Sequence, residues 1–162
     1  MFTCSALHRS ISHPGANNRI GRKNSNVAWL VDTDVLSERT RKTPNQRVLT
    51  WLEQNAAGVY TSTHVIGELQ AGISALPDGA KKRSLQQWLN RLIEAMEGRI
   101  LSFNTSVATV WGRQESDFAA KGCAMPMPDS FIAATARRHN LTIITRNTAD
   151  YKRPGLKALN PY

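Results

Sequence analysis

The sequence predicts an α/β protein, a three-layer α/β/α sandwich with a short, mostly parallel central sheet. Short apolar runs, which fit strands buried on both faces, alternate along the chain with amphipathic stretches of helical period. Acidic residues follow several of these runs, as expected where a ligand binds outside the carboxyl ends of parallel strands. With 162 residues, the chain is long enough for one domain with its own core.

Local signals predict each element in turn. Pro44 stands in the first turn of one predicted helix, and Gly58 follows the end of that helix. Thr63 is the expected N-cap of a helix that Pro77 closes. The predicted strands are 27–31, 59–62, 100–103 and 141–145, with a short edge strand at 156–159. The predicted helices are 33–40, 44–55, 63–76, 78–97, 106–121 and 129–139.

The first 26 residues differ in composition from the rest of the chain. They are rich in Ser, Asn, Arg and Gly, lack apolar periodicity and contain no acid, so we expect residues 1–26 to be a disordered basic extension before a domain at 27–162. They lack the continuous apolar stretch of a secretory signal. Two alternatives stay open: a transit peptide, and a misassigned start with Val27 as the first native residue.

The charge balance favours a polyanionic partner. The chain has 21 Lys+Arg against 12 Asp+Glu and a net charge of +9, which points most simply to nucleic acid. The two cysteines, Cys4 and Cys123, fit no metal-ligand spacing, so we expect a reducing, cytoplasmic location. No apolar run approaches the length of a membrane-spanning helix, so we expect a soluble protein with no membrane partner.

Acidic residues at the predicted strand ends are the candidate site. Asp32 and Asp34 follow the first strand, Asp150 lies beyond the fourth, and Glu68 and Asp129 stand on helices. Each acid alone fits a helix cap, a turn or a solvated surface. Together on one edge they predict a shared site, because clustered carboxylates repel one another unless a cation binds them. Mg²⁺ or Mn²⁺ is the usual cation for such oxygen ligands.

Four ordered motifs carry a resemblance to a known family. They are residues 30–38 (LVDTDVLSE), 67–73 (GELQAGI), 129–136 (DSFIAATA) and 145–151 (TRNTADY). Together they resemble a PIN domain, most closely the VapC and FitB-type toxins of bacterial toxin–antitoxin pairs, and the resemblance covers essentially all of residues 27–162. It implies a metal-dependent endoribonuclease that uses Mg²⁺, with Mn²⁺ as a substitute. It also implies a homodimer and a cognate antitoxin that blocks the acidic pocket.

The resemblance assigns roles residue by residue. Asp32, Glu68 and Asp129 match the three core acids, as catalytic residues and metal ligands. Family members place a fourth acid either where this chain has Asn147 or where it has Asp150; only Asp150 is charged here, so we expect Asp150 to be the ligand. The supporting residues would be Asn147, Thr145 and Asp34, the last at a position where the family usually has Asn.

The basic residues expected to guide the RNA backbone are Arg39, Arg41, Lys42 and Arg146.

Two other functions stay open. The segment around Asp32 and Asp34 also resembles the first motif of haloacid-dehalogenase-type phosphatases, in which the first Asp is the nucleophile and the second the general acid. However, residues 145–150 hold one acid where that family has a pair. The other alternative is a non-catalytic nucleic-acid-binding domain whose acids are structural. We expect His64 and His139 to be structural or surface residues and not metal ligands.

Overall fold

The computed structural model describes residues 28–162, so the expectations for residues 1–26 lie outside the described residues. The strands are β1 (Trp29–Val31), β2 (Val59–Ser62), β3 (Ile100–Leu101), β4 (Thr142–Ile144) and β5 (Ala158–Leu159). The α-helices are α1 (Thr33–Leu36), α2 (Gln46–Gln54), α3 (Thr63–Ser74), α4 (Ala80–Ala95), α5 (Thr105–Ala120) and α6 (Met127–His139). Two 3-10 helices, η1 (Ser37–Thr40) and η2 (Ala56–Gly58), complete the elements.

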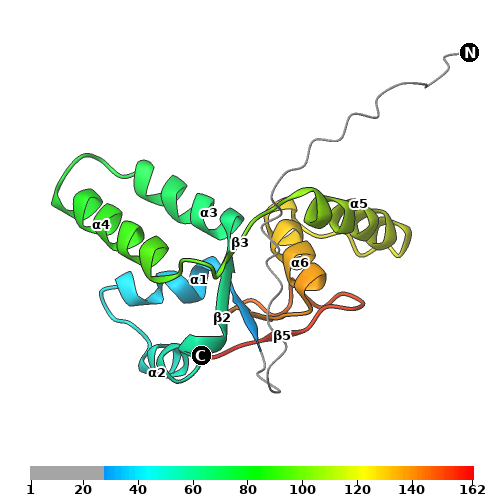
Figure 1. The fold of residues 1–162 in the computed structure, drawn as a ribbon, viewed down its shortest axis with the longest axis horizontal. Coiled ribbons are helices and arrows are strands. Elements are labelled where there is room, and N and C mark those ends of the chain that lie inside the picture. The colour runs from blue at the N-terminus through cyan, green and yellow to red at the C-terminus, as the bar shows by residue number, and fades with distance from the viewer. Residues whose placement is uncertain (1–27) are drawn as a thin grey trace, which may run out of the picture.

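The five strands form one parallel sheet in the order β3-β2-β1-β4-β5. From β1 the chain first builds outward through β2 to β3 and then returns to place β4 on the other side of β1. Figure 1 shows α1 to α4 on one side of the sheet and α5 and α6 on the other. The order of the strands therefore reverses beside β1, and the carboxyl edge at this point is where open α/β sheets bind ligands.

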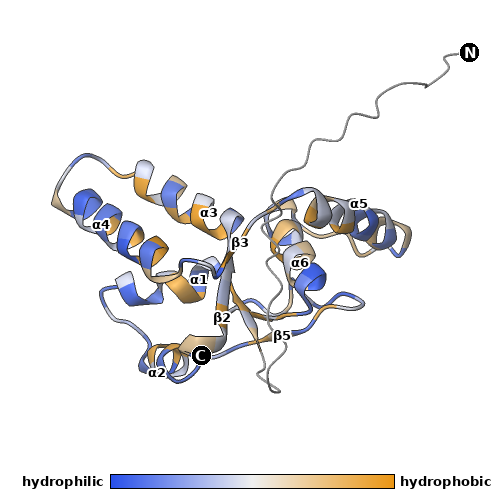
Figure 2. Ribbon diagram, in the orientation of Figure 1, coloured by the Kyte–Doolittle hydropathy of each residue, from blue (hydrophilic) through white to orange (hydrophobic). Residues whose placement is uncertain are grey.

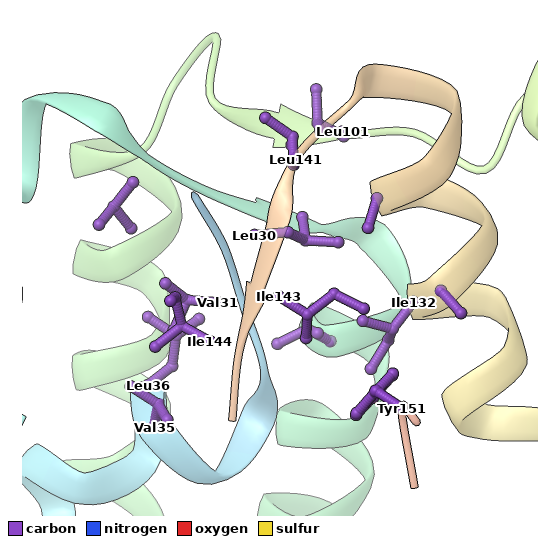
Figure 3. Packing of buried hydrophobic residues seen from close by; sticks show 14 of the residues in the cluster. Leu30, Val31, Val35, Leu36, Leu101, Ile132, Leu141, Ile143, Ile144 and Tyr151 are labelled. Carbon is purple, nitrogen blue, oxygen red and sulfur yellow. The ribbon is translucent and has the colours of Figure 1, made fainter. Parts of the chain in front are cut away.

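Two strands supply the centre of the core. Leu30 and Ile143 are paired in register and fully buried, and they face Ile132 of α6 (Figure 3). The next pair, Val31 and Ile144, points to the opposite face, towards Val35 and Leu36 (Figure 3). This alternation follows from the two-residue period of a strand, and burial on both faces explains why the strands read as continuous apolar runs.

The predicted elements are confirmed, with shifted ends. Ser62, not Thr63, caps α3, because its hydroxyl accepts a hydrogen bond from the Val65 N–H at 3.3 Å. Helix α6 begins at Met127, so Asp129 lies inside the first turn and is not the cap residue. The strand predicted at 100–103 ends at Leu101. Asn104, three residues later, is the N-cap of α5.

The helix surfaces show the expected amphipathic character. Figure 2 shows hydrophilic and hydrophobic residues alternating around α4. Within the part of the chain that the structure describes, no helix combines the length and apolarity needed to cross a membrane.

Candidate active site

Asp32 lies at the point where β1 ends and α1 begins. Its backbone N–H still donates to the Ile144 carbonyl of β4 at 3.0 Å, so the residue is held against the neighbouring strand. Its Oδ1 accepts from the Thr33 N–H at 2.6 Å and caps α1. The capping role considered for Asp32 is therefore real, but it uses one carboxylate oxygen and leaves the other for the site.

Tyr151 links Asp32 to Asp129. The tyrosine is 2% exposed, and its hydroxyl lies 3.3 Å from Asp32 Oδ2 and 3.4 Å from Asp129 Oδ1. Burial raises the pKa of Tyr151 far above its ordinary value, and the nearby charges of Asp32 and Asp129 raise it further. The phenol therefore remains a proton donor between two acids that come from β1 and α6.

Glu68 joins the group from the second turn of α3. Its carboxylate accepts a hydrogen bond from the Thr33 hydroxyl, next to Asp32. His64, one turn earlier on α3, places Nε2 at 3.4 Å from Glu68 Oε1. The sequence-based expectation for His64 missed this contact, although the spacing of four residues on one helix is a signal that could have revealed it.

The electrostatics of the group are those of crowded carboxylates. Burial raises the pKa of Asp32 to about 6, with Asp34 and Glu68 adding to the rise while the Thr33 N–H and the Thr145 hydroxyl oppose it. Burial and then the charges of Asp150 and Glu68 raise the pKa of Asp129. A bound cation would relieve this repulsion and favour the ionised forms.

The candidates for the fourth acidic position form a pair after β4. The Asn147 side-chain amide donates to Asp150 Oδ2, and the Asn147 backbone N–H donates to the Thr145 hydroxyl oxygen at 3.1 Å. Thr145 is buried directly after β4. The charge of Asp150 reaches Asp129, as the raised pKa of Asp129 reflects. Asp150 is thus electrostatically part of the acidic group, with Asn147 holding it.

Asp34 is turned towards the loop after β4. Its Oδ2 accepts from the Arg146 backbone N–H at 2.8 Å, and Oδ1 is buried with no hydrogen-bond partner among residues 28–162. Burial raises the pKa of Asp34 although the Arg146 N–H opposes the rise. Because Asp34 ties the Arg146 loop to α1, it supports the geometry of the site and is poorly placed to act as a phosphatase general acid.

Glu38 is a residue whose role the sequence analysis missed. It is 2% exposed, and its Oε1 accepts from the Asn45 N–H at 2.8 Å. Its Oε2 lies 2.9 Å from Arg41 Nε, 3.3 Å from Arg146 Nη2 and 3.0 Å from the Tyr162 hydroxyl. Burial opposes the charged form, but these donors outweigh it and lower the pKa of Glu38. This network fixes the loop that carries Asn147 and Asp150.

The basic residues expected to guide RNA are partly engaged within the protein. Arg41 and Arg146 both pair with Glu38 and keep side-chain exposures of 42% and 46%. Arg146 also lies over the Tyr162 ring, 4.1 Å from its centroid. Arg39 makes a surface pair with Glu53 at 3.5 Å, and Lys42 is exposed. Each of the four still presents charge to solvent.

The donor set fits a hard divalent cation. The hydrogen bonds of Thr33 and Tyr151 connect Asp32, Glu68 and Asp129, whose oxygens are the ligand type that Mg²⁺ prefers. In residues 28–162, no three His, Cys, Asp or Glu side chains stand close enough together to form a ready metal cluster. Mg²⁺ tolerates this, because it keeps several waters and needs few direct carboxylate ligands.

Fold and site together define a group of carboxylates at the carboxyl edge of a parallel α/β sheet, beside its switch point. The PIN domain profile matches residues 29–155. Toxin FitB of Neisseria gonorrhoeae is 36% identical over 135 residues, covering 82% of this chain and 97% of FitB. VapC ribonuclease Y4jK of Sinorhizobium fredii is 30% identical over 82% of this chain and 96% of its own. The chain belongs to the PIN domain family, in its VapC/FitB group of toxins.

Solved structures agree with this assignment. FitAcB from Neisseria gonorrhoeae matches with a TM-score of 0.77 and 36% identity, covering 82% of this chain and 97% of that one. A toxin–antitoxin complex from Klebsiella pneumoniae matches with a TM-score of 0.61 and 26% identity, over 83% and 98% of the two chains. Homologous toxins have thus been crystallised together with their antitoxins.

Proposed function

We propose that this protein is a Mg²⁺-dependent endoribonuclease that acts in the cytoplasm as the toxin of a toxin–antitoxin pair, with Mn²⁺ able to replace Mg²⁺. The proposal depends on Asp32, Glu68 and Asp129, which come from separate elements and are joined by the hydroxyls of Thr33 and Tyr151. Asp150 supplies the fourth carboxylate. Membership of the VapC/FitB group supports RNA as the substrate.

The residues have separable tasks in hydrolysis of an RNA phosphodiester. Bound Mg²⁺ supplies charge stabilisation at the phosphate and a water of lowered pKa. The four carboxylates would hold it, and the neutral Tyr151 phenol lies between Asp32 and Asp129, where its single proton can be donated to either carboxylate. Water adds across one P–O bond, so that one product carries a phosphate monoester and the other a hydroxyl group. Lys42 and the exposed faces of the nearby arginines attract the RNA backbone.

Cleavage of a mixed RNA pool by the purified, antitoxin-free protein tests this function. We expect cleavage with Mg²⁺ or Mn²⁺, none with EDTA, and loss of cleavage in Asp32→Asn. Asp78→Asn is the matched control, because the Asp78 side chain is 97% exposed and pairs only with the surface residue Lys82 in the described part of the chain. Equal cleavage by Asp32→Asn and Asp78→Asn would refute the assignment. A fluoride phosphate mimic trapping Asp32 would instead favour the phosphatase alternative.

We further propose that the antitoxin binds in the groove between α2 and α4. This groove has a volume of about 570 Å³, and its floor is apolar, with Leu52, Trp88 and Leu92. Its cationic lining residues are Arg39, Arg91 and Arg99. An apolar helix flanked by acidic residues complements this surface. A basic side chain from the same antitoxin would then block the acidic site.

Variants on α4 test the groove. Leu92→Glu places a charge in the groove, whereas Ile93→Glu is the control on the neighbouring, 38% exposed position outside it. We expect that Leu92→Glu no longer co-purifies with the antitoxin and that the antitoxin no longer relieves the growth arrest this variant causes. Ile93→Glu should behave like the wild type in both assays. If Leu92→Glu still binds the antitoxin, the antitoxin does not bind in this groove. Light scattering of the free toxin tests the homodimer proposed from the family.

A further inference from the structure

Four aromatic rings gather beside the acidic site. Phe131 of α6 lies at the centre of the cluster, with ring centroids of His64, Phe103 and Trp111 at 5.1, 4.9 and 5.4 Å. His64 comes from α3, Phe103 from the segment after β3, and Trp111 from α5. Rings from four separate segments therefore converge at one point on the carboxyl side of the sheet.

The cluster borders a hollow of about 240 Å³, lined by Thr63, His64, Phe103 and Phe131. Its walls are held in place by polar contacts. The Phe103 N–H donates to the Thr63 hydroxyl oxygen at 3.2 Å, and Trp111 Nε1 donates to the Ser130 hydroxyl oxygen at 2.8 Å. His64, Phe103 and Phe131 are each only partly buried, so a ligand can reach them.

The hollow lies beside the carboxylates, with His64 between the two. His64 lines it and lies 3.4 Å from Glu68 Oε1. Phe131 lies two residues after Asp129 on α6. A group bound in the hollow would therefore be a close neighbour of a phosphate held at the acids.

We propose that this hollow binds one nucleobase of the RNA, next to the cleaved phosphodiester; the proposal rests on the proposed endoribonuclease function. Aromatic side chains bind unpaired bases by stacking, with little dependence on base identity. The carboxylates themselves repel the RNA backbone, so a stacked base supplies an anchor that they do not.

The test combines substrate and protein changes. Once the cleaved bond is mapped, RNAs with an abasic nucleotide at each flanking position are compared with intact RNA. We expect one flanking abasic site to lower kcat/KM by roughly 5- to 150-fold. Two variants, Phe103→Leu and Phe131→Leu, keep apolar volume but remove the ring. Each should lower kcat/KM for intact RNA. In each, the abasic site should cause little further loss of kcat/KM. An abasic site farther along the RNA and the distant Trp51→Leu are the controls.

Each other outcome overturns the proposal. Equal abasic penalties in the wild type and the two Phe variants would show that the base is not bound in the hollow. If light scattering shows that the Phe variants are no longer dimeric, and the abasic site still lowers their kcat/KM as much as it does in the wild type, the hollow belongs to a subunit interface. If the wild type cleaves no RNA, the proposed endoribonuclease function is wrong, but base binding in the hollow can still be tested. The measurement is then the fluorescence quenching of 2-aminopurine in single-stranded RNA on addition of the protein. Equal quenching by the wild type and the two Phe variants would refute base binding in the hollow.

Discussion

Asp32→Asn should stabilise the metal-free protein while it abolishes activity. In the wild type, Asp32 is largely buried among Asp34 and Glu68, and its pKa is raised from 3.8 to about 6. The folded protein therefore binds a proton at Asp32 more tightly than the unfolded chain does. Asparagine removes the charge but keeps an oxygen that can accept from the Thr33 N–H, so the cap of α1 remains.

The sign and size of this stabilisation follow from the raised pKa of Asp32. Stability from the protonated form of Asp32 is fully present below pH 3.8 and is lost as the pH rises through about 6. The shift is roughly 2 pKa units, so at neutral pH the ionised Asp32 costs the metal-free fold about 3 kcal/mol. Asp32→Asn should recover much of this free energy of unfolding at pH 7.5 and almost none at pH 3.5.

Urea unfolding in EDTA at these two pH values, with Asp78→Asn as control, measures the effect. Added Mg²⁺ should then stabilise the wild type but not Asp32→Asn, because only the wild type retains the carboxylate. If Asp32→Asn were no more stable than the wild type at pH 7.5, or equally stabilised at both pH values, the electrostatic account of the site would be wrong.

Three further variants test the neighbouring residues. Tyr151→Phe removes the hydroxyl that lowers the pKa of Asp129, so its pH–rate profile should move to higher pH, with a larger loss of cleavage at pH 6 than at pH 8; an unshifted profile would contradict this. Glu38→Gln should lower the free energy of unfolding by about 2 kcal/mol at pH 7 in urea titrations, and the difference should disappear as the pH falls through the lowered pKa of Glu38. Asp150→Asn should lower kcat/KM about 10- to 100-fold, and adding Asn147→Asp should restore it; failure of the second change to rescue would show that the two positions are not equivalent.

The layout of the fold was accessible from sequence because its signals are local. The apolar pairs Leu30-Val31 in β1 and Ile143-Ile144 in β4 are fully buried, and they stand out as short apolar runs in the sequence. The acids at their carboxyl ends then fall on one edge by the geometry of a parallel sheet. The ends of elements were less accessible. Ser62 and Thr63 are both good caps, and only the fold decides that the Ser62 hydroxyl reaches Val65.

The missed residues depend on distant contacts. Tyr151 reads as an ordinary core aromatic, yet its hydroxyl meets carboxylates 119 and 22 residues away in the chain. Glu38 was visible in the first motif, but its partners Arg146 and Tyr162 join it only after β4 and β5 are in place. Such three-dimensional pairings leave no periodic pattern in the sequence.

The most direct test of the account is divalent-cation binding to the wild type and to Asp32→Asn, Glu68→Gln and Asp129→Asn, with Asp78→Asn as control. Isothermal titration with Mg²⁺ and electron paramagnetic resonance with Mn²⁺ would measure it without RNA. Each of the three variants should lose the same cation site while remaining folded, and Asp78→Asn should keep it. Wild-type affinity in all three would contradict a centre shared by these carboxylates.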